Sequence, residues 1–440
     1  MSRRIVPCLL PLLGMLINLS GAEAVPLSTT PVPPPRTLTL VEAVQLAAAT
    51  APVGIAKLET AIAQAGYGAE RMSLLPRLYA TGNLSRQATA QTSGDEITRY
   101  TPYNDIGAQL HLGQTLLDLE AWHRTKAADR QLAAAEASAT AALEEAAANA
   151  GSAYASLASA QALVVVRQDD LRLAEELFAQ AKHQVDAGSA EAISATRAAN
   201  RVETAKASLI TAEGTVRRNR ILLARALDLE PSLTLIAGQP LDEQLAVGEL
   251  PTDAEKAERT ALAVRPELRV SRETLTALEE SRKAARGAEL PKLDSFAAGG
   301  RGGPELDNTE TTWRIGVGLT VPLIDASGFR SEQATLRVAQ ERLRLRQTSD
   351  RIKAEVREAL TVIKTAQARL VSDHSRRTLA NEELTQARAR FDAGAAGNLE
   401  VIDAQRNVVA AQESLVQSTE ALIQARVRLA RAIGAATGLK

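Results

Sequence analysis

Few residues in this chain have the types and spacing that catalysis or metal binding requires. One cysteine is present, Cys8, and no Gly-x-Ser-x-Gly nucleophile elbow occurs. Covalent catalysis needs a nucleophile beside a base, and a metal site needs several ligands at close spacing. The histidines lie far apart and form no ligand motif: His111, His123, His183 and His374. The sequence therefore predicts a protein that is not an enzyme and holds no metal or cofactor.

One glycine-rich run, residues 299–303, has the composition of a phosphate-binding loop. It lacks the Gly-Lys-Ser/Thr ending of such loops, and it does not open a helix. We therefore expect a strand tip or a loop there.

The N-terminus has the pattern of a secretory signal peptide. A basic start precedes an apolar stretch over residues 5–16, and residues 22–24, Ala-Glu-Ala, have the form of a cleavage site. We predict that residues 1–24 are removed and that Cys8, in a poor context for lipidation, is removed with them. No later segment offers about 18 uninterrupted apolar residues, so an apolar membrane helix is not predicted.

The composition favours long, closely packed helices over a globular core. Aromatic residues make up 2% of the chain, and the hydrophobic fraction of 45% consists mainly of Ala, Leu and Val. The net charge is −1, with basic and acidic residues interleaved. Nucleic-acid binding needs a basic stripe, and the sequence has none.

The chain contains two copies of one long unit. An offset of 206 residues places the Asp-Ala-Gly at 186–188 on that at 392–394, and the Leu-Ala-Arg-Ala at 223–226 on that at 429–432. About a third of the positions are identical without a gap around these motifs, which identifies an internal repeat. The organisation we expect is a signal peptide (1–24), a Pro-rich tether (25–38), a first repeat (39–228), a connecting segment (229–251), a second repeat (252–434) and a short tail (435–440).

Each repeat has two segments with the alternation of β-strands. The expected strands are about 78–87 and 105–117 in the first copy, and about 293–302 and 312–324 in the second. Ile106, Ala108 and Leu110 alternate with polar or small residues, and residues 315–321 follow the same pattern. Period two over about 10 residues is the pattern of a tilted transmembrane strand with one lipid face and one water face. Tyr103 and Trp313 are candidate interfacial aromatics at the loop ends of these strands.

Each strand pair leads into a helix of unusual length. Proline is absent and glycine almost absent from the two long helices, about 119–186 and 326–392, and return helices follow at about 190–228 and 398–434. Nearly 70 helical residues span about 100 Å. The second return helix carries two apolar lines at a spacing of seven, which suits a helix with a neighbour on each side: Val408, Leu415, Leu422, Leu429 and Val409, Val416, Ile423, Ala430.

Other interpretations of these patterns remain open at this stage. The strands suit surface hairpins of a soluble domain, and the helices suit an antiparallel coiled coil with one seam. A periplasmic coiled-coil scaffold or an adaptor protein is therefore the alternative function. If the strands are transmembrane, four per chain cannot close a barrel, because known barrels start at about eight strands. In that case the chain must form a symmetric oligomer.

The order and duplication of these motifs resemble the TolC-like family of outer-membrane efflux and secretion ducts. The resemblance covers essentially the whole mature chain, through LLPRL and ELPKL before the strands, VGLTVPLIDASGFRSEQ after them, and FDAGAAGNLEVIDAQR at the helix turn. It implies a mainly α fold with a 12-stranded transmembrane β-barrel formed by a homotrimer, continuous with an α-helical tunnel. It also implies that the protein lies in the outer membrane of a Gram-negative bacterium, in contact with outer-membrane lipid. The implied partners are a periplasmic adaptor and an inner-membrane pump of the RND, ABC or MFS type.

In that family the two helix turns at the periplasmic end receive the adaptor. The candidate docking residues here are Gly188, Ser189, Gly394 and Ala395, although the two glycines would also serve as simple helix C-caps.

The family's aperture-lining acidic positions fall on Glu400 and Asp403. A ring of carboxylates around an axis would attract cations. The alternative is that both are solvated residues at a helix N-terminus, where acidic side chains are favourable. The family's polar latch positions are Phe391 and Ala396 here, so those latch bonds are not expected.

Overall fold

The computed structural model describes residues 35–93, 96–188, 190–241, 251, 253–305, 307–324, 326–393, 395 and 397–439. The predicted signal peptide and most of the predicted tether lie outside them. The helices are α1 (Leu40–Ala47), α2 (Ala51–Met72), α3 (Leu119–Asp186), α4 (Ala192–Ala226), α5 (Ala254–Val264), α6 (Pro266–Gly287), α7 (Ser327–Asp392), α8 (Asn398–Ile433) and the short 3-10 helix η2 (Ala436–Gly438). The strands are β1 (Arg36–Leu38), β2 (Arg77–Ser93), β3 (Glu96–Leu117), β4 (Leu235–Ala237), β5 (Lys292–Glu305) and β6 (Asn308–Thr320).

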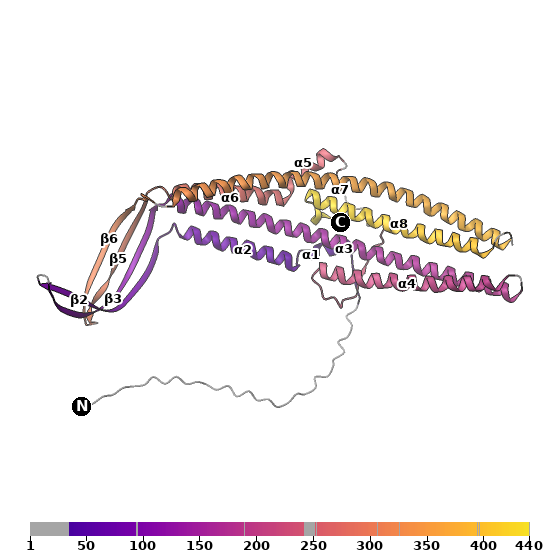
Figure 1. Cartoon of the computed structure of the whole chain (residues 1–440), viewed down its shortest axis with the longest axis horizontal. Helices are drawn as coiled ribbons and strands as arrows, with labels where there is room; N and C mark the ends of the chain where they lie inside the picture. Colours follow the sequence, from indigo (N-terminus) through magenta and orange to yellow (C-terminus); the bar gives the residue numbers. More distant parts are fainter. Residues whose placement is uncertain are drawn as a thin grey trace, which may run out of the picture.

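The molecule is a long rod with a β-sheet at one end and two helix turns at the other (Figure 1). The helices α3 and α7, of 68 and 66 residues, run from the sheet to the turns. The remaining long helices cover only part of that length. Near the sheet, α2, α3, α6 and α7 pack side by side in that order, and near the turns the order is α4, α3, α8 and α7. The rod is therefore a single layer of helices over most of its length.

The breaks between the short helices follow from local sequence. The side chain of Thr39 accepts a hydrogen bond from the backbone N–H of Glu42, and the Glu42 carboxylate accepts one from the backbone N–H of Thr39. The two bonds form a capping box at the start of α1. The prolines at positions 52 and 266 lie in the first turns of α2 and α6, where a missing N–H costs nothing. Because proline disrupts a helix interior, the sequence predicts an interruption beside each of these prolines, and the structure has both interruptions.

The return helices α4 and α8 end in the same way. Asp228 and Gly434, which are 206 residues apart, have positive φ angles of 55° and 74°. In each case a backbone N–H one residue later donates to a carbonyl in the last helical turn, from Leu229 to Ala224 and from Ala435 to Ala430, at 2.8 Å. The Asp228 carboxylate also accepts from the backbone N–H of Ala51 at 3.2 Å. It thereby joins the C-terminus of α4 to the N-terminus of α2.

Four strands form one antiparallel sheet in the order β2-β3-β5-β6. The two strand pairs expected from the sequence are thus adjacent hairpins, joined through β3 and β5. At 17 and 22 residues, β2 and β3 are longer than the alternating pattern indicated, because their polar ends continue the pairing. The sheet is open, with β2 and β6 as its edges.

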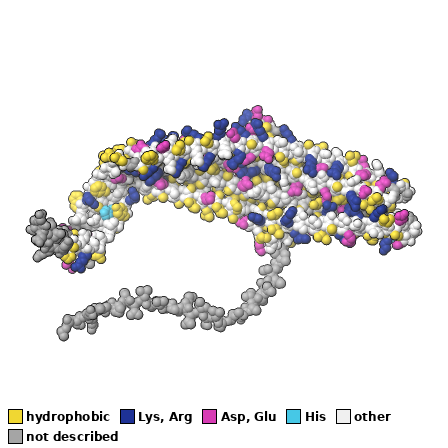
Figure 2. Space-filling view, in the orientation of Figure 1, with side chains coloured by type: hydrophobic (Ala, Val, Ile, Leu, Met, Phe, Trp, Pro, Cys, Tyr) yellow, Lys and Arg dark blue, Asp and Glu magenta, His cyan; other side chains and the backbone are white. Residues whose placement is uncertain are grey.

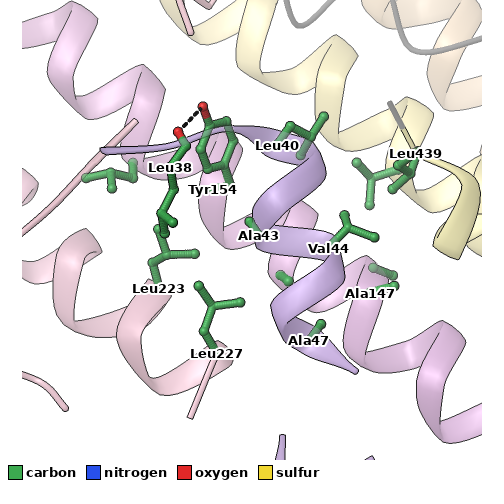
Figure 3. Packing of buried hydrophobic residues seen from close by; sticks show 14 of the residues in the cluster. Leu38, Leu40, Ala43, Val44, Ala47, Ala147, Tyr154, Leu223, Leu227 and Leu439 are labelled. Carbon is green, nitrogen blue, oxygen red and sulfur yellow. Dashed lines mark hydrogen bonds between the residues drawn. The ribbon is translucent and has the colours of Figure 1, made fainter. Parts of the chain in front are cut away.

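A buried core lies at the middle of the rod, where the two repeats meet (Figure 3). Tyr154 on α3 is fully buried, and its hydroxyl donates to the carbonyl of Leu38 at 3.0 Å. Its oxygen also accepts from the backbone N–H of Gln239 at 3.4 Å. Strands β1 and β4 pair in parallel beside it, so one tyrosine ties the segment before the first repeat to the segment after it.

Replacement of Tyr154 by Phe should lower the free energy of unfolding by about 1 kcal/mol, because the ring still fills the core while its hydrogen bonds are lost. The measurement is the denaturant midpoint of the purified protein in detergent. Tyr67→Phe, on a partly exposed position of α2, is the matched control and should leave the midpoint unchanged. Equal midpoints for Tyr154→Phe and the parent would contradict the role given to the hydroxyl.

Candidate functional site

The sheet has one apolar face. Directly paired residues of neighbouring strands point to the same side, and Leu110 pairs with Gly299, which pairs with Trp313. The same face carries large exposed apolar side chains: Leu78, Leu84, Leu110, Leu112, Trp313, Ile315, Val317 and Leu319. Trp313 is 77% exposed, which is unfavourable in water for so large a ring. This face requires an apolar neighbour.

The opposite face of the sheet is polar. Tyr79 stacks on His111, with ring centroids 4.9 Å apart, and Thr81 Oγ1 lies 2.9 Å from His111 Nε2. Asn83 Nδ2 donates to Asp105 at 2.8 Å on the same side. The alternation predicted from the sequence is therefore confirmed, because one face is apolar and the other is polar.

Tyr103 lies on the polar face and not on the apolar one. It pairs with Gln87 and its hydroxyl donates to Gln87 Oε1 at 3.3 Å. Side chains alternate along a strand, so Tyr103, an odd number of residues from Leu110, points to the other side. Of the two aromatics expected at the membrane interface, only Trp313 shares the lipid-type face.

The glycine-rich run belongs to strand β5. A Cβ at Gly300 would collide with the carbonyl oxygen of Ala108 on the neighbouring strand β3. Glycine is needed here for close approach of two strands, and the run has no helix after it that could bind a phosphate.

The two helix turns lie together at the end of the rod away from the sheet (Figure 1). Gly188 follows α3 with a φ angle of 71°, and no atom lies near the position of a Cβ. Ala395 is exposed, and its N–H donates to the carbonyl of Arg390 at 2.8 Å. The other expected docking residues, Ser189 and Gly394, lie outside the described residues, as does Ala396. Asn398 donates to the carbonyl of Ser194 at 3.0 Å and thereby joins the two turns.

The candidate aperture residues lie in the first two turns of α8. Glu400 is 3.4 Å from Arg390 and Asp403 is 3.5 Å from Arg406, measured between side-chain oxygen and nitrogen. Both carboxylates are about half exposed, and each pairs within the α7–α8 hairpin. Phe391 is buried beside them and offers no hydroxyl. Within the described part of the chain, the acidic pair is thus exposed at the tip and forms no ion pair with the α3–α4 hairpin.

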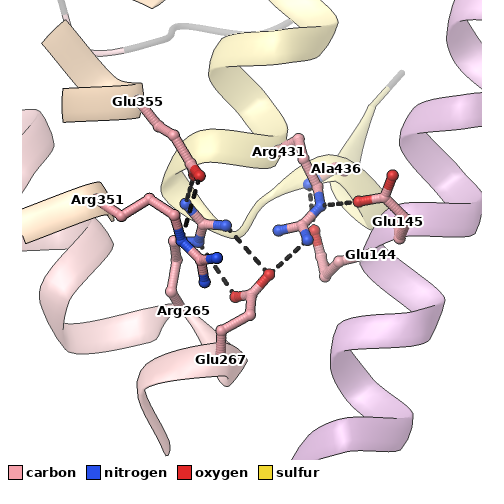
Figure 4. Close-up of polar contacts among 8 residues, drawn as sticks. All are labelled: Glu144, Glu145, Arg265, Glu267, Arg351, Glu355, Arg431 and Ala436. Atoms are coloured by element: carbon pink, nitrogen blue, oxygen red, sulfur yellow. Dashed lines mark hydrogen bonds and ion pairs between the residues drawn. The ribbon is translucent and has the colours of Figure 1, made fainter. Parts of the chain in front are cut away.

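A cluster of charges at the middle of the rod joins α6, α7, α8 and α3 (Figure 4). Glu267 accepts from Arg265 at 3.1 Å and from Arg431, and Arg265 also donates to Glu355. Arg431 reaches Glu145 on α3 at 2.8 Å. We call this set the ionic junction. The sequence shows only the helix break at Pro266 here, because the partners are up to 286 residues apart.

The ionic junction controls the ionisation of Glu267. Burial by itself would raise the pKa of this carboxyl group, but hydrogen bonds from Arg265 and Arg431 outweigh burial and lower the pKa to about 2. The arginine of α8 thus fixes the first turn of α6, so the two helices stack end to end as α4 and α2 do.

Among the described residues, no three His, Cys, Asp or Glu side chains come together as metal ligands would. Nearby on α3, Glu144 is buried and accepts from the backbone N–H of Ala436 and the hydroxyl of Thr437, both at 2.6 Å. These carboxylates hold helix ends in place.

A layer of long helices that ends in a sheet with one lipid-type and one water-type face defines a membrane duct protein with a helical extension. The sequence matches the family model described as "Outer membrane efflux protein" over residues 44–228 and 259–435. The chain belongs to this family, and it is an outer-membrane efflux channel.

Two curated relatives are similar over most of their length. The outer membrane protein OprJ of Pseudomonas aeruginosa is 26% identical over 400 residues, which cover 86% of this chain and 80% of the relative. The probable efflux pump outer membrane protein TtgC of Pseudomonas putida is 25% identical over 406 residues, with coverages of 86% and 79%. The crystal structure of CusC has the same fold, with a TM-score of 0.80 at 19% identity, and covers 90% of this chain and 91% of its own.

The ionic junction predicts a pH-dependent contribution to stability. Since folding lowers the pKa of Glu267 from 4.5 to about 2, its charge contributes about 3 kcal/mol above pH 4.5, and this contribution disappears as the pH falls towards 2. Glu267→Gln should therefore be less stable than the parent at pH 7, with a difference that shrinks below pH 4.5. Denaturant midpoints at several pH values measure this difference.

The control for this series is Glu203→Gln, which removes an exposed carboxylate whose partner Lys206 is one turn away on the same helix. This variant should change the free energy of unfolding little at any pH. A difference between Glu267→Gln and the parent that stayed constant from pH 7 to pH 3 would show that the charge of Glu267 is not what stabilises the junction.

Proposed function

We propose that three copies of this chain form a passive duct, in which a 12-stranded β-barrel continues into an α-helical tunnel. The duct would carry substrates from an inner-membrane pump and a periplasmic adaptor to the cell exterior, with no catalytic step. The observation that carries this proposal is that one chain leaves two complementary edges unpaired, one at each side of its layer of strands and helices.

The strand edges require partners in a membrane. β2 and β6 each expose one row of backbone N–H and C=O groups, and such groups are costly in hydrocarbon. Pairing of β6 of one copy with β2 of the next would repeat around a ring until it closes. Three copies of four strands give the barrel that the family resemblance implies, and they exceed the minimum of about eight strands.

The helices at the two edges carry matching apolar side chains. On α2, Ile55, Leu58 and Ile62 recur at intervals of three and four residues and are 58%, 66% and 71% exposed. On α7, the apolar line recurs at intervals of seven: Phe329, Leu336 and Leu343. These are the spacings of a coiled-coil seam. We infer that α7 of one copy packs on α2 of the next.

The apolar character of α2 has a second interpretation. Within the described residues, Leu40–Met72 is the one helical stretch long and apolar enough to cross a membrane by itself. However, α1 is buried in the central core and α2 packs along α3. A seam against a second copy covers the exposed residues of α2 without removing this packing. Figure 2 shows apolar side chains over the helices next to the sheet, with charged side chains interspersed among them and along the rest of the rod.

The polar face of the sheet would line the barrel, and the apolar face with Trp313 would contact outer-membrane lipid. The turns at Gly188 and Ala395, with Ser189 and Gly394, would then project into the periplasm and receive the adaptor. Relatives named as outer membrane proteins of efflux pumps support an assembly with an adaptor and a pump of the RND, ABC or MFS type. A type I secretion system is the other assembly that such a duct serves.

The exposed pair Glu400 and Asp403 would narrow the periplasmic opening. In a ring of three copies, the first turns of α8 would bring six carboxylates to the axis. These carboxylates would attract cations and hold water and counterions at the constriction. The buried Phe391 supports a tip held by packing rather than by a hydroxyl latch.

Fractionation of cells, the mass of the purified protein in detergent and recordings in planar bilayers together test the duct. We expect an outer-membrane protein with the mass of a trimer and discrete conductance. Ile62→Asp should abolish the trimer, because it places a charge in the seam. Val165→Asp changes an exposed apolar residue of α3, which is not an edge helix, and should leave the trimer intact.

A monomeric soluble protein without conductance would overturn the duct. The strands would then be surface hairpins, and a periplasmic coiled-coil scaffold or adaptor would be the better function. A trimer that survives Ile62→Asp would instead refute the seam and leave the strand edges as the assembly contact.

Neutralisation of both aperture candidates should enlarge the closed opening. The double variant Glu400→Gln and Asp403→Asn should raise the single-channel conductance severalfold and remove block by divalent cations, since the ring charge is lost. The control is Glu383→Gln, a carboxylate that contacts Asn407 within the same hairpin. Unchanged conductance and unchanged cation block in the double variant would exclude the acidic pair from the aperture.

A further inference from the structure

In the half of the rod nearer the turns, the helical hairpins α3–α4 and α7–α8 contact each other mainly through α3 and α8. Two ion pairs cross this boundary among the described residues. One is Arg431–Glu145 in the ionic junction, and the other is Arg167–Glu413. From Arg167 to the turn at Gly188 is about 30 Å of helix. The second pair is therefore the last ionic contact between the hairpins before their tips.

Arg167 and Glu413 belong to a cluster of four charges. Arg167 Nη1 lies 4.0 Å from Asp170 Oδ2, and Asp170 pairs with Arg201 of α4. Asp170 and Arg201 are 3% and 7% exposed, and Arg167 and Glu413 are 22% and 21% exposed. Two cations and two anions thus meet at the contact of three helices, largely out of water. Loss of one member leaves a buried charge without its partner, which is strongly unfavourable.

The contacts nearer the tips are neutral or exposed. Gln405 donates to the carbonyl of Leu173 at 3.5 Å, and Gln180 donates to Asp392 at 3.4 Å on the surface. Leu177 packs into the apolar cluster between α7 and α8. Water can replace the two polar contacts, and Leu177 can slide along the apolar cluster, whereas separation of buried opposite charges has a defined cost. In the half of the rod nearer the turns, the four charges are thus the ionic contact that resists separation of the hairpins.

We propose that Arg167, Asp170, Arg201 and Glu413 form a buried ionic clasp that holds the α7–α8 hairpin against the α3–α4 hairpin and thereby keeps the tips together. The clasp rests on the proposed function only in treating the tips as the gated end of a duct. Along the helices the clasp lies about 20 residues from the turns, and it therefore differs from contacts at the tip itself.

The surroundings of Glu413 define how the clasp responds to protons. α3 presents Arg167 and Asp170, and α4 presents Arg201 behind Asp170. On the α7 side, Asp373 accepts from Ser414, the neighbour of Glu413, and lies 3.6 Å from Arg369. Burial raises the pKa of Glu413, the Arg167 charge opposes this, and Asp170 adds to it. Without Arg167, protonation would be the remaining way to neutralise Glu413 in the closed arrangement.

The test measures the distance between the tips directly. Spin labels at cysteines that replace Gln180 and Asp392, which are in contact across the two hairpins, report whether the tips touch. In Arg167→Met the ratio of touching to separated labels should fall roughly tenfold or more at pH 7, because Glu413 is then buried without a cation. The ratio should recover as the pH is lowered, because protonation neutralises Glu413 in the touching arrangement.

Two further variants keep the test decisive. Arg172→Met is the matched control, since Arg172 pairs only with Asp169 and Glu176 of its own helix among the described ion pairs, and it should change nothing. The double variant Arg167→Met with Glu413→Leu should hold the tips together at pH 7 and at lower pH alike, because an apolar pair can replace a buried ion pair.

Parent-like label contact in Arg167→Met at every pH would overturn the clasp. If Arg167→Met fails to fold, the double variant decides, because restored folding with touching tips supports the clasp, and failure of both overturns it. Label distances need no channel activity. If Arg167→Met changes the label contact in a protein that shows no conductance, the duct alone is refuted. If the protein conducts but Arg167→Met leaves the label contact unchanged, the clasp alone is refuted.

Discussion

The length of α3 and α7 is the constraint on which the rest of the structure depends. A helix of nearly 70 residues needs a neighbour along its whole length, because an isolated helix gains little stability in water. The chain meets this need by stacking two shorter helices end to end. Asp228 connects α4 to α2, and the ionic junction connects α8 to α6. Both stacks lie at the level of the buried core around Tyr154, where the two repeats are joined.

The same arrangement explains why buried charges are used where they are. An apolar junction would tolerate rotation or sliding of one helix end against the other, whereas Glu267 accepts from two arginines in fixed directions. Farther along the rod, small residues of α3 allow close packing, and the clasp around Arg167 fixes the register of α8 on α3. Apolar contacts hold the layer together, and charges determine its alignment.

The sheet follows a different rule from the helices. Its alternation separates lipid from water across one layer of strands, which leaves no room for a core. Stability must then come from neighbours, both lipid and further strands, and the exposed seams on α2 and α7 extend this need into the helical part. The strand edges left open in one chain are the basis of the assembly that we propose.

The sequence by itself determined the repeat, the two long helices, the helix breaks at Pro52 and Pro266 and the two faces of the strands. These features are local, because periodicity, caps and proline act within a few residues. The family resemblance placed Glu400 and Asp403, but their partners Arg390 and Arg406 became visible only in the structure.

Only the tertiary structure decided that β3 extends through Tyr103 and so turns it to the polar side, that β3 pairs with β5, and that Arg431 reaches Glu267 and Glu145. Strand register and ion pairs between residues far apart in sequence depend on how whole helices and hairpins align. That alignment is set by packing across the layer, which no short-range pattern encodes.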